Sequence, residues 1–187
     1  MPLGAARFGL LGGVADLGKL ELIETQTISS SFADFESLGS YNVHLFTFNN
    51  LVPNVQDTIG IRFSNDGGTS YISSGYQYAF QRGYPSTFTE LKSTSQNRIL
   101  IGGTVGVATE DNMNGYMYCY NLGNSSKYSF ITLQIVHTLL SSSIYSSFWF
   151  GSGVLPTAEI HNGVRFGSGS FNVLGSGSIS LYGIAES

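Results

Sequence analysis

The sequence has little charge. Asp, Glu, Lys and Arg make up 11% of its 187 residues, less than half the share of about 25% that is typical of globular domains. The eight basic residues are scattered and the net charge is −4, whereas a nucleic-acid-binding protein normally presents a clustered cationic face. We therefore expect no nucleic-acid partner. Weak charge also gives weak protection against association, which favours self-assembly or burial on a partner.

Cysteine and long apolar runs are also scarce. The single cysteine, Cys119, excludes an intrachain disulfide, and we expect a buried, unreactive thiol because residues 116–120 alternate as a strand does. No apolar run approaches the roughly 20 residues of a membrane-spanning helix, so we expect no membrane insertion. Residues 1–14 are apolar, but glycines interrupt them and no convincing signal-peptide cleavage site follows. We interpret 1–19 as an extended N-terminal arm.

What the chain has in quantity is apolar and aromatic residues, 42% and 13%, which argue for a packed core. Alternation with period two dominates, and helical periodicity is almost absent. The predicted strands are 20–28, 41–48, 59–64, 70–80, 99–107, 115–120, 129–136, 144–150, 158–166 and 179–184. A helix of at most two turns fits 32–38. These patterns predict an all-β domain over 20–187, an antiparallel β-sandwich of the jelly-roll type.

Turn residues separate the strands. The run Asn65-Asp66-Gly67-Gly68 offers side chains that tolerate positive φ, and Asn162-Gly163 lies between apolar flanks; both predict hairpins. Segment 167–180 has the Gly/Ser pairs of a linker, but Phe171 and the apolar residues around it favour a tight turn between the final strands.

Residues that could carry chemistry do not form a recognisable constellation. His44, His137 and His161 fall on different predicted strands or strand ends without metal-pair spacing. The Gly-Ser-Gly segments lack the context of a nucleophile elbow or a phosphate loop, and Glu110-Asp111 is the only adjacent acidic pair. Loops 65–66 and 110–114 could bind Ca²⁺ through oxygen atoms, but a turn without an ion is favoured because neither has EF-hand spacing. We expect no enzyme activity, no cofactor and no metal.

Aromatic residues alternate on three segments and leave three interpretations open. Tyr combines apolar area with a hydrogen-bonding tip, so such rows suit a sandwich core, a subunit interface or a glycan platform. Core packing is favoured for the rows as a whole. The candidate interface residues, from the arm and from the aromatic rows, are Leu3, Phe8, Leu10, Leu11, Tyr76, Tyr78, Tyr118 and Trp149.

Four segments resemble a known family. They are residues 22–27 (LIETQT), 41–44 (YNVH), 61–71 (IRFSNDGGTSY) and 177–184 (GSISLYGI). The pattern, over 20–184, is similar to small structural proteins of tailed bacteriophages. That resemblance implies a β-sandwich module on the capsid surface or in a tail appendage, often assembled as a trimer, with no catalytic residues. The chain has no heptads or triple-stranded repeats of a fibre stalk.

The expected function is therefore that of a virion structural protein, assembled in the host cytoplasm. A capsid decoration or cement protein is favoured, with itself as a homotrimer and the major capsid protein or tail proteins as partners. The alternative is a tail fibre, adaptor or receptor-binding module that recognises a host glycan. A glycan-degrading enzyme or esterase is the third and least favoured interpretation.

Overall fold

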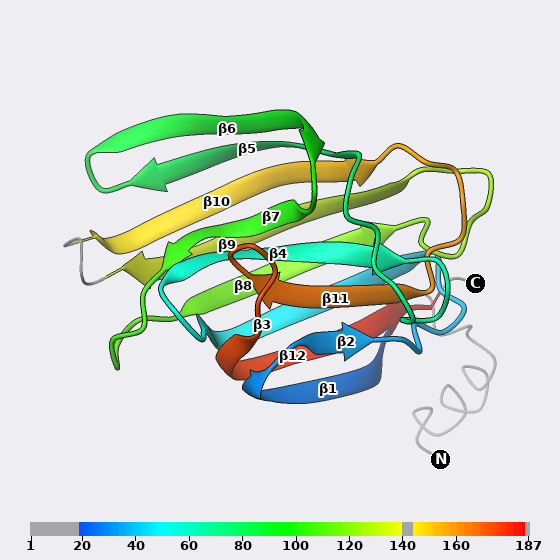
Figure 1. The fold of residues 1–187 in the computed structure, drawn as a ribbon, viewed down its shortest axis with the longest axis horizontal. Helices are drawn as coiled ribbons and strands as arrows, with labels where there is room; N and C mark the ends of the chain where they lie inside the picture. Colours follow the sequence, from blue (N-terminus) through cyan, green and yellow to red (C-terminus); the bar gives the residue numbers. More distant parts are fainter. Residues whose placement is uncertain (1–18, 140–143, 186–187) are drawn as a thin grey trace, which may run out of the picture.

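Two antiparallel sheets pack face to face in the computed structural model, which describes residues 19–139 and 144–185 (Figure 1). Every regular element in these residues is a strand. The predicted all-β fold and antiparallel β-sandwich are therefore confirmed. The predicted arm, 1–19, lies outside the described residues except for Lys19.

The larger sheet has eight strands and the smaller has four. The eight-stranded sheet contains, in spatial order, β1 (Leu20–Ser31), β12 (Leu174–Ile184), β3 (Val43–Pro53), β8 (Met113–Tyr120), β9 (Ser129–Leu139), β10 (Ile144–Leu155), β5 (Tyr76–Tyr84) and β6 (Thr87–Gln96). The four-stranded sheet contains β2 (Ala33–Phe35), β11 (Gly163–Ser168), β4 (Asp57–Ser64) and β7 (Ile99–Val105). The smaller sheet covers only part of the larger one, and the β5–β6 hairpin extends beyond β7 (Figure 1).

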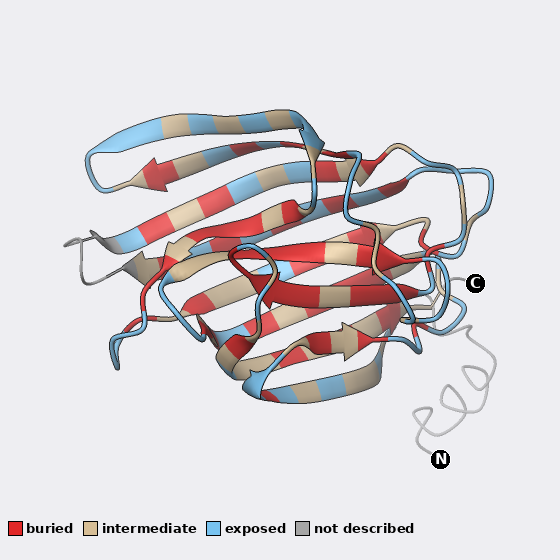
Figure 2. Cartoon of the chain, viewed as in Figure 1, coloured by how far each residue is buried: buried red, intermediate tan, exposed pale blue. Residues whose placement is uncertain are grey.

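The space between the sheets is filled by aromatic and aliphatic side chains. Phe166 of β11 lies at the centre, with ring centroids 5.9 Å from Phe35, 5.2 Å from Phe46 and 5.6 Å from Phe48, all three edge-on or nearly so. Aromatic rings prefer such edge-to-face contacts because the ring edge is positive and the ring face negative. Figure 2 shows that buried residues dominate β4, β7 and β11 of the smaller sheet and alternate with more exposed ones along the strands of the larger sheet.

Segment 32–38 contains the three-residue strand β2 (Ala33–Phe35) and no helix, so the predicted short helix is wrong. Ala33 and Phe35 share one face of β2 and are both fully buried. β2 pairs with β11, where Val164 lies opposite Phe35. A three-residue strand gives almost no sequence signal of its own, and burial of Phe35 in the core decides the conformation.

The two predicted hairpins are wrong, although their turn residues behave as expected. Gly67 and Gly68 adopt positive φ, 73° and 88°, but β4 before them and β5 after them belong to different sheets. Asn162 and Gly163 do not connect two paired strands: Gly163 begins β11, and Asn162 accepts a hydrogen bond from the Gly67 amide through its side-chain oxygen (2.8 Å). Turn chemistry predicts where the chain bends and not which strand it joins next.

Strand β6 was not predicted. Its sequence, TFTELKSTSQ, is polar, and it pairs with β5 at the edge of the larger sheet. Charged and hydroxyl side chains are common on edge strands because they discourage pairing with another chain. Alternation of apolar and polar residues, the pattern from which strands are predicted, is therefore weak in the edge strand β6.

We expect Phe166→Ala to lower the free energy of unfolding by about 3–5 kcal/mol, because it leaves a cavity at the centre of the aromatic cluster. Denaturant titration followed by tryptophan fluorescence measures the change. Phe88→Ala is the matched control, since Phe88 is 70% exposed, and we expect it to cost less than about 1 kcal/mol. Equal losses in the two variants would contradict the central role of Phe166.

Candidate functional site: the tyrosine face of the eight-stranded sheet

One side of the eight-stranded sheet faces away from the smaller sheet and is rich in aromatic residues. On β8, Met117 and Cys119 point inward and are fully buried, while Tyr116, Tyr118 and Tyr120 alternate with them and are exposed or half-buried. The period of two along a strand separates the two sets. The tyrosines that alternate in the sequence are therefore directed outward.

Cross-strand register extends this surface over the neighbouring strands. Tyr118 lies opposite Thr132 and Tyr120 opposite Phe130 on β9, and Phe150 of β10 lies opposite Gln134. We call this surface the tyrosine face. Its members are the outward side chains Val43, Leu45 and Thr47 on β3, Tyr116, Tyr118 and Tyr120 on β8, Phe130, Thr132, Gln134 and Val136 on β9, Phe148, Phe150, Ser152 and Val154 on β10, and Gln77, Ala79 and Gln81 on β5.

No member of the tyrosine face carries a charge, and several large apolar members are exposed. Phe150 and Val136 are each 47% exposed, and Tyr116 and Phe130 are each 41% exposed. The first charged side chains at the β5 side are Glu90 and Lys92 on the edge strand β6, an exposed pair 3.5 Å apart. A continuous exposed apolar surface of this kind typically marks an interaction site.

The polar atoms of the tyrosine face are bound to one another. The Tyr116 hydroxyl donates to Oε1 of Gln134 (2.9 Å), and the hydroxyl groups of Tyr120 and Thr132 are 3.2 Å apart. Rings also contact their neighbours along each strand: Tyr118 stacks on Tyr120. Side chains held in this way lose little conformational freedom when a partner covers them.

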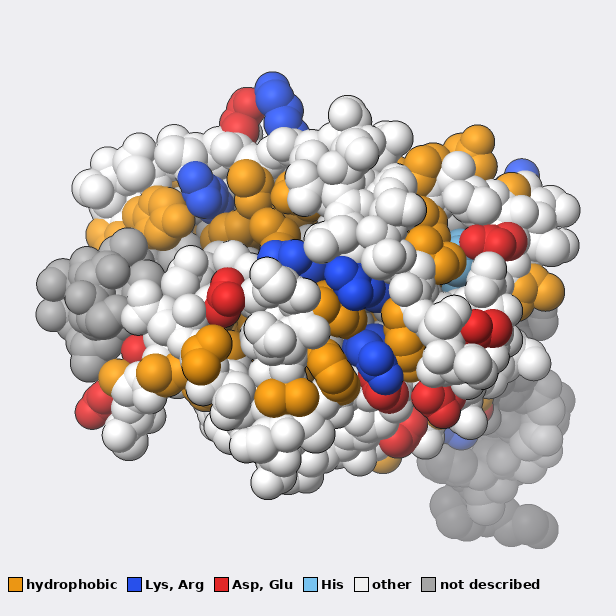
Figure 3. Space-filling model, in the orientation of Figure 1, with side chains coloured by type: hydrophobic (Ala, Val, Ile, Leu, Met, Phe, Trp, Pro, Cys, Tyr) orange, Lys and Arg blue, Asp and Glu red, His pale blue; other side chains and the backbone are white. Residues whose placement is uncertain are grey.

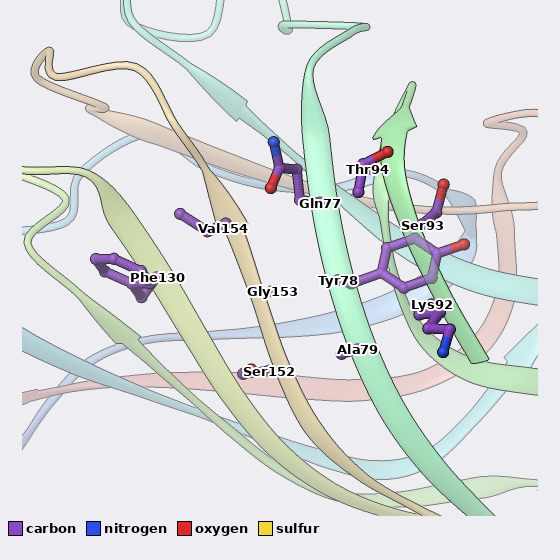
Figure 4. Close-up of a pocket in the computed structure, with 10 residues that line it drawn as sticks. All are labelled: Gln77, Tyr78, Ala79, Lys92, Ser93, Thr94, Phe130, Ser152, Gly153 and Val154. Carbon is purple, nitrogen blue, oxygen red and sulfur yellow. The ribbon is translucent and has the colours of Figure 1, made fainter. Parts of the chain in front are cut away.

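A groove of about 660 Å³ runs along this face between β9 and β6. Small residues, Ala79 and Ser152, form its floor, and Phe130 and Lys92 lie on its two sides (Figure 4). The groove exists because the outward residues Ala79 of β5 and Ser152 of β10 are small, whereas Phe130 of β9 and Lys92 of β6 on its two sides are large. An extended segment of a partner or a sugar ring could lie there against Phe130.

The candidate interface residues named from the sequence separate into three groups. Tyr118 lies on the tyrosine face. Tyr76, Tyr78 and Trp149 are buried, only 0%, 8% and 1% exposed, because their positions on β5 and β10 have the inward parity. They pack in the core and offer almost no surface to a partner, although Tyr78 also borders the groove. Leu3, Phe8, Leu10 and Leu11 lie outside the described residues.

Phe130 and Val136 were not identified from the sequence. The signal for them is weak because β9 alternates in the usual way, with apolar residues on both faces: Ile131, Leu133 and Ile135 are buried. A strand with apolar residues on both faces is predicted to be covered on both sides. Here one of those sides is exposed.

The three histidines are buried and lie apart. His44 Nε2 is 2.8 Å from the Leu38 carbonyl oxygen, and His161 Nδ1 is 2.7 Å from Ser129 Oγ. His137 has no hydrogen-bond partner in the described part of the chain. Residues 19–139 and 144–185 contain no cluster of three His, Cys, Asp or Glu side chains able to hold a metal.

The loops considered for Ca²⁺ use their carboxylates internally. Asp66 accepts hydrogen bonds from the hydroxyl groups of Ser70 (2.6 Å) and Ser64 (2.8 Å), which hold its pKa down at about 2. Oδ2 of Asp111 accepts from the Ala108 amide (3.1 Å). These oxygen atoms stabilise turns. Burial raises the pKa of the Cys119 thiol well above its usual range, which suits an unreactive core thiol.

Comparison with known proteins gives no family: no family model matches the sequence, and no curated protein matches it. Within the described residues, no helix is long and apolar enough to cross a membrane.

We expect His137→Leu to weaken the pH dependence of stability between pH 6.5 and 4. Burial lowers the pKa of His137 from 6.5 to about 4, so the unfolded chain takes up this proton first as the pH falls. Stability is then lost across that interval, by an amount on the order of 3 kcal/mol.

The leucine variant removes this component and loses no hydrogen bond, so its stability at pH 7.5 should match that of the natural chain. Denaturant titrations at several pH values measure both effects. Burial also lowers the pKa of His44 and His161, so a smaller loss in the same direction remains in the variant. An unchanged pH profile would show that His137 titrates normally.

Proposed function

We propose that the protein is a non-catalytic structural protein of a tailed-phage particle, a capsid decoration or cement protein that assembles through its tyrosine face. The observation that carries the proposal is the charge-free, partly exposed aromatic surface over β3, β8, β9, β10 and β5. The sequence resemblance supplies the phage context. The favoured assembly is a homotrimer that contacts the major capsid protein.

The physical case for assembly is the low cost of covering this face. Burying a charge requires a compensating partner, whereas covering Phe and Val side chains is favourable in proportion to their apolar area. Tyrosine and phenylalanine are enriched in the cores of protein interfaces, and charged residues are depleted there. Copies of this chain all carry a net charge of −4, so they repel each other least where no charged side chain lies between them.

The strand order supports a jelly-roll connection of the sandwich. Strands β1, β12, β3 and β8 are neighbours in one sheet, and β2, β11, β4 and β7 form the other. The chain passes between the sheets at β1 to β2, β2 to β3, β3 to β4, β4 to β5, β6 to β7, β7 to β8, β10 to β11 and β11 to β12. The β5–β6 hairpin and the β9–β10 pair extend the first sheet beyond β8. Two interlocking four-strand sets of this kind form the jelly rolls of many viral capsid and lectin domains. This likeness is one of fold and does not by itself assign function.

A receptor-binding tail module that recognises a host glycan is the second candidate, and the groove beside Phe130 favours it. A sugar ring can pack its apolar face on an aromatic ring while hydroxyl groups such as that of Ser152 bind its edge. In this case the tyrosine face would remain exposed in the assembled protein. The two candidates therefore differ in whether the protein buries this face against copies of itself.

The first prediction from this proposal concerns mass in solution. We expect light scattering on the full chain to give about three times 20.1 kDa, and Phe150→Glu to convert the trimer to monomer, because it places a charge at the centre of the tyrosine face. Val55→Glu is the matched control: Val55 is 53% exposed in the turn after β3, so the same substitution there should leave the mass unchanged. A monomeric natural chain contradicts assembly through this face.

The second prediction concerns the particle. The full chain should bind capsids of its phage that lack the decoration protein, and deletion of residues 1–14 should abolish this binding while the trimer mass is retained. Sedimentation of the protein with capsids measures it. Binding to host cells or polysaccharide in place of capsids, lost on Phe130→Ala, would instead establish the receptor-binding module.

A further inference from the structure

A row of arginine side chains crosses the outward surface of the four-stranded sheet, on the other side of the molecule from the tyrosine face. Arg165 on β11 and Arg62 on β4 are register partners. The β4–β7 register, which pairs Ile61 with Ile99, brings Arg98 opposite Arg62 when it is continued by one residue. Figure 3 shows basic side chains following one another across this face. In a chain with eight basic residues and a net charge of −4, this is a local concentration of positive charge.

The row is electrostatically unfavourable in the protein alone. Like charges directly opposite each other on neighbouring strands destabilise a sheet. Burial lowers the pKa of Arg62, and the charges of Arg98 and Arg165 lower it further. Among the described residues, Arg165 is the member of the row that an ion pair neutralises: its Nε and Nη2 each donate to Asp34 at 2.6 Å.

The other arginines in the row have polar but uncharged partners. Nε of Arg62 donates to the Asn97 carbonyl oxygen (2.8 Å), and Nη1 of Arg98 donates to the side-chain oxygen of Asn97 (3.0 Å). Burial lowers the pKa of Arg98, and the more distant charge of Asp57 offsets part of this shift. Neither Arg62 nor Arg98, however, forms an ion pair with a carboxylate of the described residues that would occupy its N–H groups.

The row is held in place by its neighbours. Arg62 lies over the Phe171 ring at 4.0 Å, and Arg165 lies over the Tyr71 ring at 4.0 Å. Arg98 lies across Gly60, where a Cβ atom would come within 2.7 Å of its Cδ. The guanidinium groups lie with their flat faces against rings or backbone, so the N–H groups at their edges can still bind an anion. Because the side chains are already held in place, they lose little conformational entropy on binding.

A small cavity adjoins the row beyond Arg98. It has a volume of about 280 Å³ and lies between β7 and the overhanging β5–β6 hairpin. Thr58 lines it and accepts a hydrogen bond from Nη2 of Arg98 (3.4 Å). Hydrophobic side chains are exposed in the strip between the hairpin and the four-stranded sheet (Figure 3). The volume is close to the lower end of the range for small-ligand sites, about 300–1,000 Å³.

The cavity combines one positive charge with aromatic walls. Arg82 lies over Tyr84 at 5.8 Å and over Trp149 at 5.9 Å, and its Nε donates to Thr89 Oγ1 (2.6 Å). No carboxylate of the described residues forms an ion pair with it. In the cavity wall, both ring nitrogens of His137 and Nε1 of Trp149 lack hydrogen-bond partners in the described part of the chain. Buried polar atoms without partners are uncommon, and these nitrogen atoms can form hydrogen bonds with a water molecule or a polar ligand in the cavity.

We propose that the cavity and the arginine row together bind an acidic polysaccharide. One sugar ring enters the cavity, where its carboxylate pairs with Arg82 and its apolar face packs on Tyr84. The following units lie across the sheet with their carboxylates against Arg98 and Arg62. This site lies beyond the proposed assembly function and uses none of the residues of the tyrosine face.

A polysaccharide fits this surface better than the other polyanions. The row runs across the strands, so a peptide that followed it could not pair its backbone with the free edge of β7, which is how sheets usually capture peptides. Nucleic acid needs more phosphate contacts than three unpaired arginines provide. A sugar chain needs no backbone ladder, and its carboxylates match the guanidinium edges.

The test is calorimetric titration of the full-length protein with oligogalacturonate at low ionic strength, with the methyl-esterified oligomer as the uncharged ligand of the same size. We expect binding of the acid form only. Arg98→Gln, Arg62→Gln and Arg82→Gln should each weaken it about tenfold. Lys127→Gln, which removes a positive charge from an exposed loop, should change the affinity by less than about twofold.

Thermal unfolding of each variant shows that it is folded, so that loss of binding reports on the site. Equal binding of the esterified oligomer, or unchanged affinity in the three arginine variants, overturns the proposal. A polyglutamate peptide that binds as tightly as oligogalacturonate, with the same sensitivity to the arginine variants, also overturns it in favour of an acidic protein partner. Because the proposed trimer forms through another face, its presence or absence does not alter these outcomes.

Discussion

The interlocking of aromatic rings around Phe166 is the contact on which the rest of the structure depends. Phe35 from β2, Phe46 and Phe48 from β3, and Phe166 itself from β11 join the two sheets at their centre. Once these residues face inward, the period of two along each strand directs every second side chain of both sheets outward. The tyrosine face and the arginine row are thus the outward counterparts of one internal packing arrangement.

The two outward surfaces have opposite chemistry. The tyrosine face of the eight-stranded sheet presents aromatic and hydroxyl groups without charge, and the four-stranded sheet presents guanidinium groups held by aromatic rings and backbone oxygen atoms. A surface that gains from losing water suits a permanent partner, and a surface that keeps hydrated charges suits a soluble polar ligand. A sandwich with one surface of each kind can be fixed to an assembly on one side and still bind on the other.

The fold class and most strands could be predicted from the sequence, because residues on β4 and β8 alternate with the period of two that a strand requires. The sequence did not predict β2, which is too short to show a period, or β6, which lies at an edge of the sheet where apolar alternation is not needed.

Of the candidate site residues, Tyr118 could be predicted from its spacing on the strand. The inward parity of Tyr76 and Trp149 could not, since a strand with aromatic residues on both faces does not show which face is covered. The arginine row could not be found either, because Arg62, Arg98 and Arg165 meet only through pairing between distant strands.

The position of Cys119 allows the reactivity of its thiol to report on opening of the sheet. The only thiol of the protein is fully buried between the outward residues Tyr118 and Tyr120. A reagent in solution can reach its sulfur atom only when β8 separates from the facing sheet or from β3 and β9 beside it. The rate of thiol modification therefore counts the openings of the central strands, and it does so without any engineered label.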